Sequence, residues 1–156
     1  MTPFFSTPER LEKLRQVAAT WEGTPFFAHA CVKGEGVDCV RLAHAILHEC
    51  GGVPPVDFPA YTIDHTHHAD RSQLLPFLLN DPALAGRLRM VPLIQIQPGD
   101  IVACQVGHAD HHLAVLLPDG YLIHALERAG VTLTHKTDTS LAKRALYAMR
   151  VMESKT

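Results

Sequence analysis

The stretch GEGVDCVRLAHAILHECGG, residues 34–52, begins with glycines, continues as an apolar run and ends in two further glycines. Within it, apolar side chains recur at the spacing of one helical face, at Cys39, Ala43, Ile46, Leu47 and Cys50. The closing glycines and the prolines that follow them are typical of a helix end. The stretch therefore predicts a helix over about 38–49, with Asp38 just before its first turn and Cys39 within that turn.

The position of Cys39 in a first helical turn has a chemical consequence. A thiol there lies against unpaired backbone N–H groups and the positive end of the helix dipole, and both favour the thiolate. Asp38 can cap the helix with its side chain, and the N–H of Cys39 then points to where an oxyanion would form. We therefore predict that Cys39 is a nucleophile. The simpler alternative is a small buried residue, which is how we interpret Cys31, Cys50 and Cys104.

The composition is that of an ordinary globular protein, with 156 residues of which 47% are hydrophobic and 19% charged. A net charge of −2 argues against a nucleic acid partner, and no apolar run approaches the roughly 18 residues of a membrane span. The N-terminal residues lack the basic and apolar regions of a signal peptide, so we expect a protein that is cytoplasmic at synthesis. The four cysteines show no Cys-x-x-Cys spacing, which argues against a zinc ribbon or a thioredoxin motif.

Helical patterns precede strand patterns along the chain. Ser6 begins a capping box that predicts a helix over 7–20, and short helical segments are expected at 74–79 and 83–88. After residue 90, apolar runs between turns predict strands at 101–104, 113–117, 121–125, 131–134 and 145–151. Ser140 is expected to cap one turn of helix before the last strand. Helices followed by antiparallel strands indicate an α+β fold.

Two of the 11 histidines lie in a predicted β-hairpin, His112 at the start of its first strand and His124 near the end of its second. Because side chains alternate along a strand, the two rings can be neighbours on one face. We predict that one ring orients the other, which takes the proton from Cys39. A slip of one residue would put His111 in the place of His112, and that alternative stays open.

Short motifs in a fixed order resemble the NlpC-type cysteine peptidases, papain-like hydrolases that act mostly on bacterial cell-wall peptides. The motifs are GTPF at 23–26, GVDCVRL at 36–42, PGDIV at 98–102, HLAVL at 112–116 and IHA at 123–125. The first segment and the long insert at 53–90 look most like the phage or prophage branch of that family. The resemblance implies one papain-like domain over 1–156, with N-terminal helices packed on a small antiparallel sheet or half-barrel, and no cofactor.

By that resemblance, Cys39 is the nucleophile, His112 the general base and acid, and His124 the third, orienting member. The implied reaction is attack on an amide carbonyl, a thioester intermediate and its hydrolysis, with peptidoglycan stem peptides as the expected substrate. The implied partner is a peptide or peptidoglycan fragment, with no nucleic acid and no membrane span. The expected site of action is the cell wall after lysis, phage assembly, or the outside of the cell after non-classical export. A phage or secretion-machinery partner is expected accordingly.

The resemblance also places Asp38 and three departures from the family pattern beside the substrate, namely Phe26, Val40 and Arg41. The family usually has a tyrosine at the position of Phe26, with a hydroxyl that reaches toward the active site. It usually has Ser-Gly at the position of Val40-Arg41, and that serine helps to hold the acidic end of the substrate peptide. Arg41 either replaces this contact as an anion binder or lies on the solvent face.

Two other functions stay open. The departures are compatible with a related thiol enzyme that acts on another amide, an ester or a thioester. The second alternative is a non-catalytic phage structural or metal-binding module, since histidines crowd two loops. These crowded residues are His65, His67 and His68, and His108, Asp110, His111 and His112. Zinc needs three or four convergent ligands, and such loop histidines are more often solvated, so we predict no metal site.

Overall fold

The computed structural model describes residues 2–58, 74–106 and 109–154, without the side chains of 74, 106 and 109–111. Its helices are α1 (Pro8–Trp21), α2 (Cys39–Glu49), α4 (Leu74–Asn80) and α5 (Thr139–Ala142), with a 3-10 turn, η1 (Leu93–Gln95). Its strands are β1 (Cys31–Val32), β2 (Gly36–Val37), β3 (Leu88–Val91), β4 (Ile101–Val106), β5 (Ala109–Leu116), β6 (Tyr121–Leu126), β7 (Gly130–His135) and β8 (Ala145–Val151). No helix in the described part of the chain is long and apolar enough to cross a membrane.

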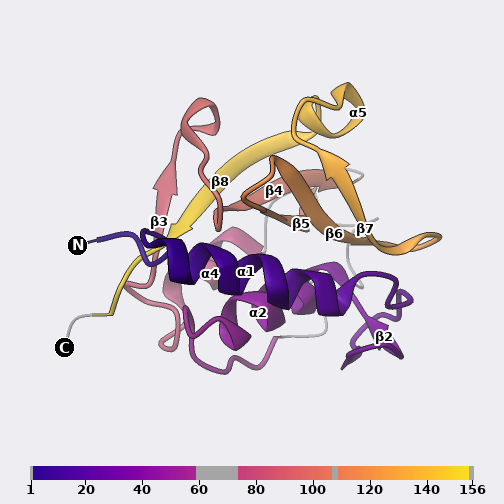
Figure 1. The fold of residues 1–156 in the computed structure, drawn as a ribbon, viewed down its shortest axis with the longest axis horizontal. Coiled ribbons are helices and arrows are strands. Elements are labelled where there is room, and N and C mark those ends of the chain that lie inside the picture. The colour runs from indigo at the N-terminus through magenta and orange to yellow at the C-terminus, as the bar shows by residue number, and fades with distance from the viewer. Residues whose placement is uncertain (1, 59–73, 107–108, 155–156) are drawn as a thin grey trace.

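Six of the strands form one antiparallel sheet, in the order β3-β8-β4-β5-β6-β7. In Figure 1, α1, α2 and α4 lie together on one side of this sheet, and α5 lies apart from them. The main apolar core joins α1 and α2 to alternate residues of the strands, including Leu113, Val115 and Ile123. A smaller core covers the opposite face and includes Ala114 and Leu116. Helices packed against an antiparallel sheet confirm the predicted α+β class.

The two N-terminal helices follow the predicted pattern closely. α2 occupies the expected segment, and Val40, Ile46 and Leu47 on it are fully buried in the main core. α1 is capped by Thr7, whose extended backbone lets its hydroxyl accept the N–H of Arg10 at 3.3 Å. The prediction that Ser6 caps this helix was therefore wrong by one residue.

Three local expectations are corrected by pairing between distant segments. Residues 82–87 form turns instead of a helix, and β3 follows because it pairs with β8 at the edge of the sheet. β5 begins at Ala109, earlier than predicted, because it pairs with the end of β4. α5 is capped by Asp138, which accepts the N–H of Ser140, so that Ser140 is not itself the cap.

A buried ion pair fixes the turn that precedes β4. Asp100 is 1% exposed and accepts bonds from Nε and Nη2 of Arg150 on β8, each at 2.9 Å. The backbone N–H of Gln97 donates to the same carboxylate at 2.8 Å. This bidentate contact ties the turn before β4 to the C-terminal end of β8.

Replacing Arg150 with Met tests the energetic weight of this pair. The change leaves the carboxylate of Asp100 buried without its cation, so we expect the free energy of unfolding to fall by about 3 kcal/mol in urea titrations. Arg15→Met breaks an exposed ion pair with Glu12 and is the matched control, for which no measurable change is expected. Equal effects of the two substitutions would contradict the prediction.

Candidate active site

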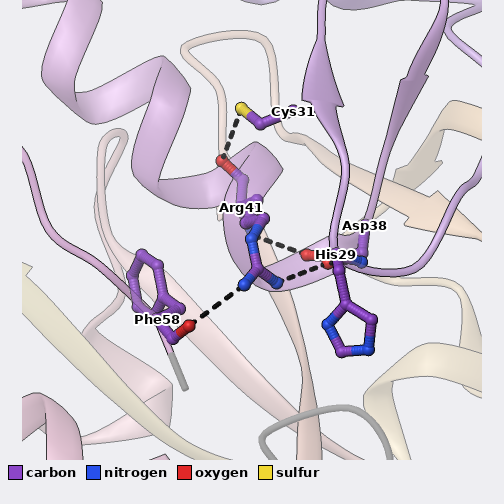
Figure 2. Close-up of polar contacts among 5 residues, drawn as sticks. All are labelled: His29, Cys31, Asp38, Arg41 and Phe58. Carbon is purple, nitrogen blue, oxygen red and sulfur yellow. Dashed lines mark hydrogen bonds and ion pairs between the residues drawn. The ribbon is translucent and has the colours of Figure 1, made fainter. Parts of the chain in front are cut away.

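The carboxylate of Asp38 organises the N-terminus of α2. It is fully buried and accepts the N–H of Arg41 at 2.9 Å, which makes Asp38 the N-cap of the helix. The same carboxylate accepts the N–H of His29 at 2.8 Å and pairs with Nη1 of Arg41 at 2.7 Å (Figure 2). The predicted capping role of Asp38 is confirmed. A carboxylate held by three donors in this way is a structural anchor for the first turn.

The guanidinium of Arg41 is committed to protein partners. Besides its ion pair with Asp38, its Nη2 donates to the backbone carbonyl of Phe58 at 3.1 Å (Figure 2). Its side chain is 17% exposed, so the expectation that Arg41 lies on the solvent face was wrong. The alternative expectation was that Arg41 binds an anion of the substrate. For this, the guanidinium would have to leave Asp38 and Phe58 or bind the anion in addition to them.

Cys39, the first residue of α2, lies where two strands of the sheet separate. The pairing of β5 with β6 extends only over Val115↔Ile123 and Leu116↔Leu122. Because Leu116 donates to the carbonyl of Asp100, just before β4, alternation directs the N–H of Leu113 to the β6 side, where the ladder has ended. That N–H is instead directed toward Cys39, where it favours the thiolate form of the side chain. The N-terminus of α2 thus lies where β6 would otherwise continue to pair with β5.

Burial decides the protonation state of Cys39. The side chain is 5% exposed, and desolvation raises the pKa of the thiol to about 12 although the N–H groups of Leu113, Val40 and Cys39 itself favour the thiolate. The buried carboxylate of Asp38 also raises this pKa. The expectation of a thiolate in the resting protein is therefore corrected to a neutral thiol, because desolvation outweighs the amides of the helix end.

The rings of His112 and His124 are in direct contact. Nε2 of His112 lies 2.8 Å from Nδ1 of His124, and the ring centroids are 5.0 Å apart at an interplanar angle of 68°. In the register of the hairpin, His124 falls opposite Ala114, which makes His112 its diagonal neighbour on the same face. The predicted adjacency of the two rings is confirmed. The contact is made by His112, and the side chain of His111 lies outside the described residues.

A hydroxyl that the sequence analysis missed extends this pair. Nε2 of His124 lies 2.8 Å from Oγ1 of Thr134 on β7. β6 and β7 pair with Leu122 opposite Thr134 and His124 opposite Thr132, so Thr134 is again a diagonal neighbour. The signal in the sequence was that His112, His124 and Thr134 share one face of three successive strands. To use it, one had to know the register of the second hairpin, β6–β7.

The hydrogen bonds of this chain can run in two directions. In one, His112 donates from Nε2 to His124, and His124 donates from Nε2 to Thr134, which leaves Nδ1 of His112 as a basic nitrogen. In the other, Thr134 donates to His124 and His124 to His112, so that the proton of His112 sits on Nδ1. Only the first direction equips His112 to accept a proton.

The histidines border a cavity that also touches the smaller core at Cys104 and Leu141. It has a volume of about 230 Å³ and is bordered by Cys104, Gln105 and Arg144, together with His112, His124 and Thr134. Burial lowers the pKa of His112 to about 3, and the positive charge of Arg144 acts in the same direction. Burial also lowers the pKa of His124. Both rings are therefore neutral at pH 7.

The remaining predicted substrate residues contribute mainly to packing. Phe26 is half-buried, packs on the main core and makes an isolated bridge with Val37. Val40 has no exposed surface, and its side chain lines an apolar cavity beneath α2. A substrate contact by Val40 would therefore have to come from its backbone.

The histidine clusters lie largely beyond what the structure describes. His65, His67, His68 and His108 are outside the described residues, as are the side chains of Asp110 and His111. Among the residues that are described, no three His, Cys, Asp or Glu side chains are grouped so that they could hold a metal ion.

The neutral state of His112 predicts how stability depends on pH. The unfolded chain takes up a proton near pH 6.5, whereas the folded chain resists it to about pH 3. The free energy of unfolding should therefore fall as the pH drops below 6.5, with His112 contributing up to about 1.4 kcal/mol per pH unit. His112→Gln should flatten this slope in urea titrations between pH 4 and 7, whereas His135→Gln should not. If the free energy of unfolding depended on pH with the same slope in the wild type and in both variants, the prediction would be contradicted.

The direction of the hydrogen-bonded chain can be read by ¹⁵N NMR of the imidazoles. We expect His112 and His124 both to carry the proton on Nε2, with Thr134 accepting. Thr134→Val should abolish the single tautomer of His124, whereas Thr134→Ser should preserve it because the hydroxyl remains. A proton on Nδ1 of His112 in the wild type would contradict the direction that leaves this ring basic.

Comparisons with known proteins bear on the family and the fold. The model of the NlpC/P60 family matches residues 23–150. A comparison with curated proteins found no match. Similar solved structures include an NlpC/P60 family protein from Bacillus cereus, with 18% identity over 88% of this chain and a TM-score of 0.58. The chain spans only 39% of that protein.

Two further similar structures are peptidoglycan hydrolases. The NlpC/P60 domain of the peptidoglycan hydrolase SagA shares 17% identity, with 92% of this chain and 98% of that domain covered and a TM-score of 0.58. RipB from Mycobacterium tuberculosis shares 16% identity, with 97% and 69% covered and a TM-score of 0.57. These likenesses establish the papain-like α+β fold expected from the motifs. The match over most of its length shows that the chain belongs to the NlpC/P60 family.

Proposed function

We propose that this protein is a thiol-dependent hydrolase that cleaves a peptide amide bond in peptidoglycan stem peptides. The family supports a hydrolase of this kind, and the solved relatives SagA and RipB are peptidoglycan hydrolases by name. The observation that carries the proposal is local. The backbone amide of Leu113 favours the thiolate of Cys39, and Leu113 directly follows His112, whose ring contacts that of His124 at 2.8 Å.

In the proposed first step, the ring of His112 approaches Cys39, and its Nδ1 takes the proton of the thiol while the sulfur attacks the scissile carbonyl carbon. The new C–S bond places negative charge on the carbonyl oxygen, and the backbone N–H of Cys39 at the tip of α2 is a donor for it. His124 holds the imidazolium in place through Nε2 of His112. The C–N bond then breaks, and the leaving amine takes the proton from His112.

The second half of the reaction restores the thiol. His112 accepts a proton from water as the oxygen attacks the thioester carbon. The C–S bond then breaks, the sulfur regains a proton from His112, and the acyl part leaves as a carboxylic acid. Because both groups are neutral at rest, proton transfer accompanies attack in this scheme instead of preceding it.

A related substrate class is supported by the ion pair of Arg41 with Asp38. The serine that holds the acidic end of the substrate in relatives is replaced by a fully buried Val40, and Arg41 already has a carboxylate partner. A substrate that lacks this acidic contact, such as another amide, an ester or a thioester, is therefore the second candidate for the same scaffold.

Digestion of purified peptidoglycan, with fragments resolved by mass, tests the proposal. The wild type should release stem-peptide fragments, and Cys39→Ala should lower the rate at least about 10³-fold because the nucleophile is lost. Cys50→Ala, at the other end of α2, is the matched control and should keep the wild-type rate. Cleavage that survives in Cys39→Ala would overturn the proposal, and hydrolysis of acyl thioesters alone would favour the second candidate.

A further inference from the structure

The cavity beside His112 and His124 is bordered by one arginine, Arg144. Arg144 stands between α5 and β8, and its charge acts on both His112 and Cys104 across the cavity. Within the described residues no carboxylate pairs with it. Arg144 is therefore an exposed, unmatched positive charge that borders the same cavity as the two histidines.

Four other arginines of this chain are matched by carboxylates, whereas Arg87, Arg89 and Arg128 are not among the ion pairs of the described residues and do not border this cavity. Arg10, Arg15, Arg41 and Arg150 pair with Glu153, Glu12, Asp38 and Asp100, respectively. Arg41, the anion binder considered from the sequence, is thereby occupied. Arg144 is the arginine that remains available next to the histidines, in a cavity of about 230 Å³, which is large enough for a small acidic group.

We propose that Arg144 forms a subsite that binds a carboxylate of the peptide substrate in this cavity. This inference rests on the proposed function, because the carboxylate belongs to the proposed substrate and the subsite lies beside the proposed base, His112. A guanidinium binds a carboxylate in a bidentate manner, and Thr134 and Gln105 on the cavity wall bring further polar groups to the same space.

A bound carboxylate would also change the charge around the base. In the free protein, Arg144 opposes the protonation of His112. A carboxylate on Arg144 cancels that charge, so the imidazolium that forms during attack on the substrate would be less disfavoured. The subsite would thus couple recognition of an acidic substrate to the basicity of His112.

Binding can be measured without any turnover, by NMR of the imidazole C–H groups with glutarate as the probe and neutral glutaramide as its control. We expect glutarate to shift the signals of His112 and His124 in the wild type, and glutaramide to leave them in place. Arg144→Gln should weaken glutarate binding at least about 10-fold, as loss of a charge-assisted bond implies. Lys143→Gln removes a neighbouring cation that does not border the cavity and should bind as the wild type does.

Turnover of wall peptides then separates this inference from the proposed function. With an acidic peptide, Arg144→Gln should raise KM about 10-fold or more, and with the matching peptide amide it should not. Glutarate shifts without any hydrolysis would refute the function and retain the subsite. Hydrolysis that is equal in wild type and Arg144→Gln, with no glutarate shift, would refute the subsite and retain the function.

Discussion

The buried carboxylate of Asp38 is the contact on which the site depends. It caps α2, binds the N–H of His29 and pairs with Arg41, so that one group joins the helix to the segment before β1. A fully buried charge is tolerated only when it is paired and hydrogen-bonded, and these donors meet that requirement. Because the cap defines where α2 begins, it also defines where the sulfur of Cys39 lies.

The second constraint is the early end of the β5–β6 ladder. Had the strands continued to pair, the N–H of Leu113 would have been used within the sheet. Their separation leaves this N–H for Cys39, and the helix tip fills the opening. The result is a thiol that is buried and neutral at rest, with a pair of neutral imidazoles on β5 and β6.

Charge is distributed unevenly around the candidate site. Arg41, which follows the cysteine in sequence, is neutralised by Asp38 within the same helical turn. Arg144, which is remote in sequence, borders the cavity with no carboxylate among the described residues. Proximity along the chain was therefore a poor guide to which cation lacks a carboxylate partner, since the helix-capping Asp38 already pairs with Arg41.

Local chemistry in the sequence was enough to predict α2, its cap at Asp38, the hairpin and the adjacency of His112 and His124. Each of these depends on spacing within one element or across one tight turn, which the backbone period determines. The order of the motifs also identified the family.

Other features depended on contacts between segments far apart in the chain. β3 exists because β8 pairs with it, Thr134 reaches His124 through the register of a second hairpin, and Arg144 meets the cavity through α5. The pKa of Cys39 is the clearest case. Its helical position favours the thiolate, but burial beneath distant strands raises its pKa, and desolvation is a property of the whole fold that no local pattern encodes.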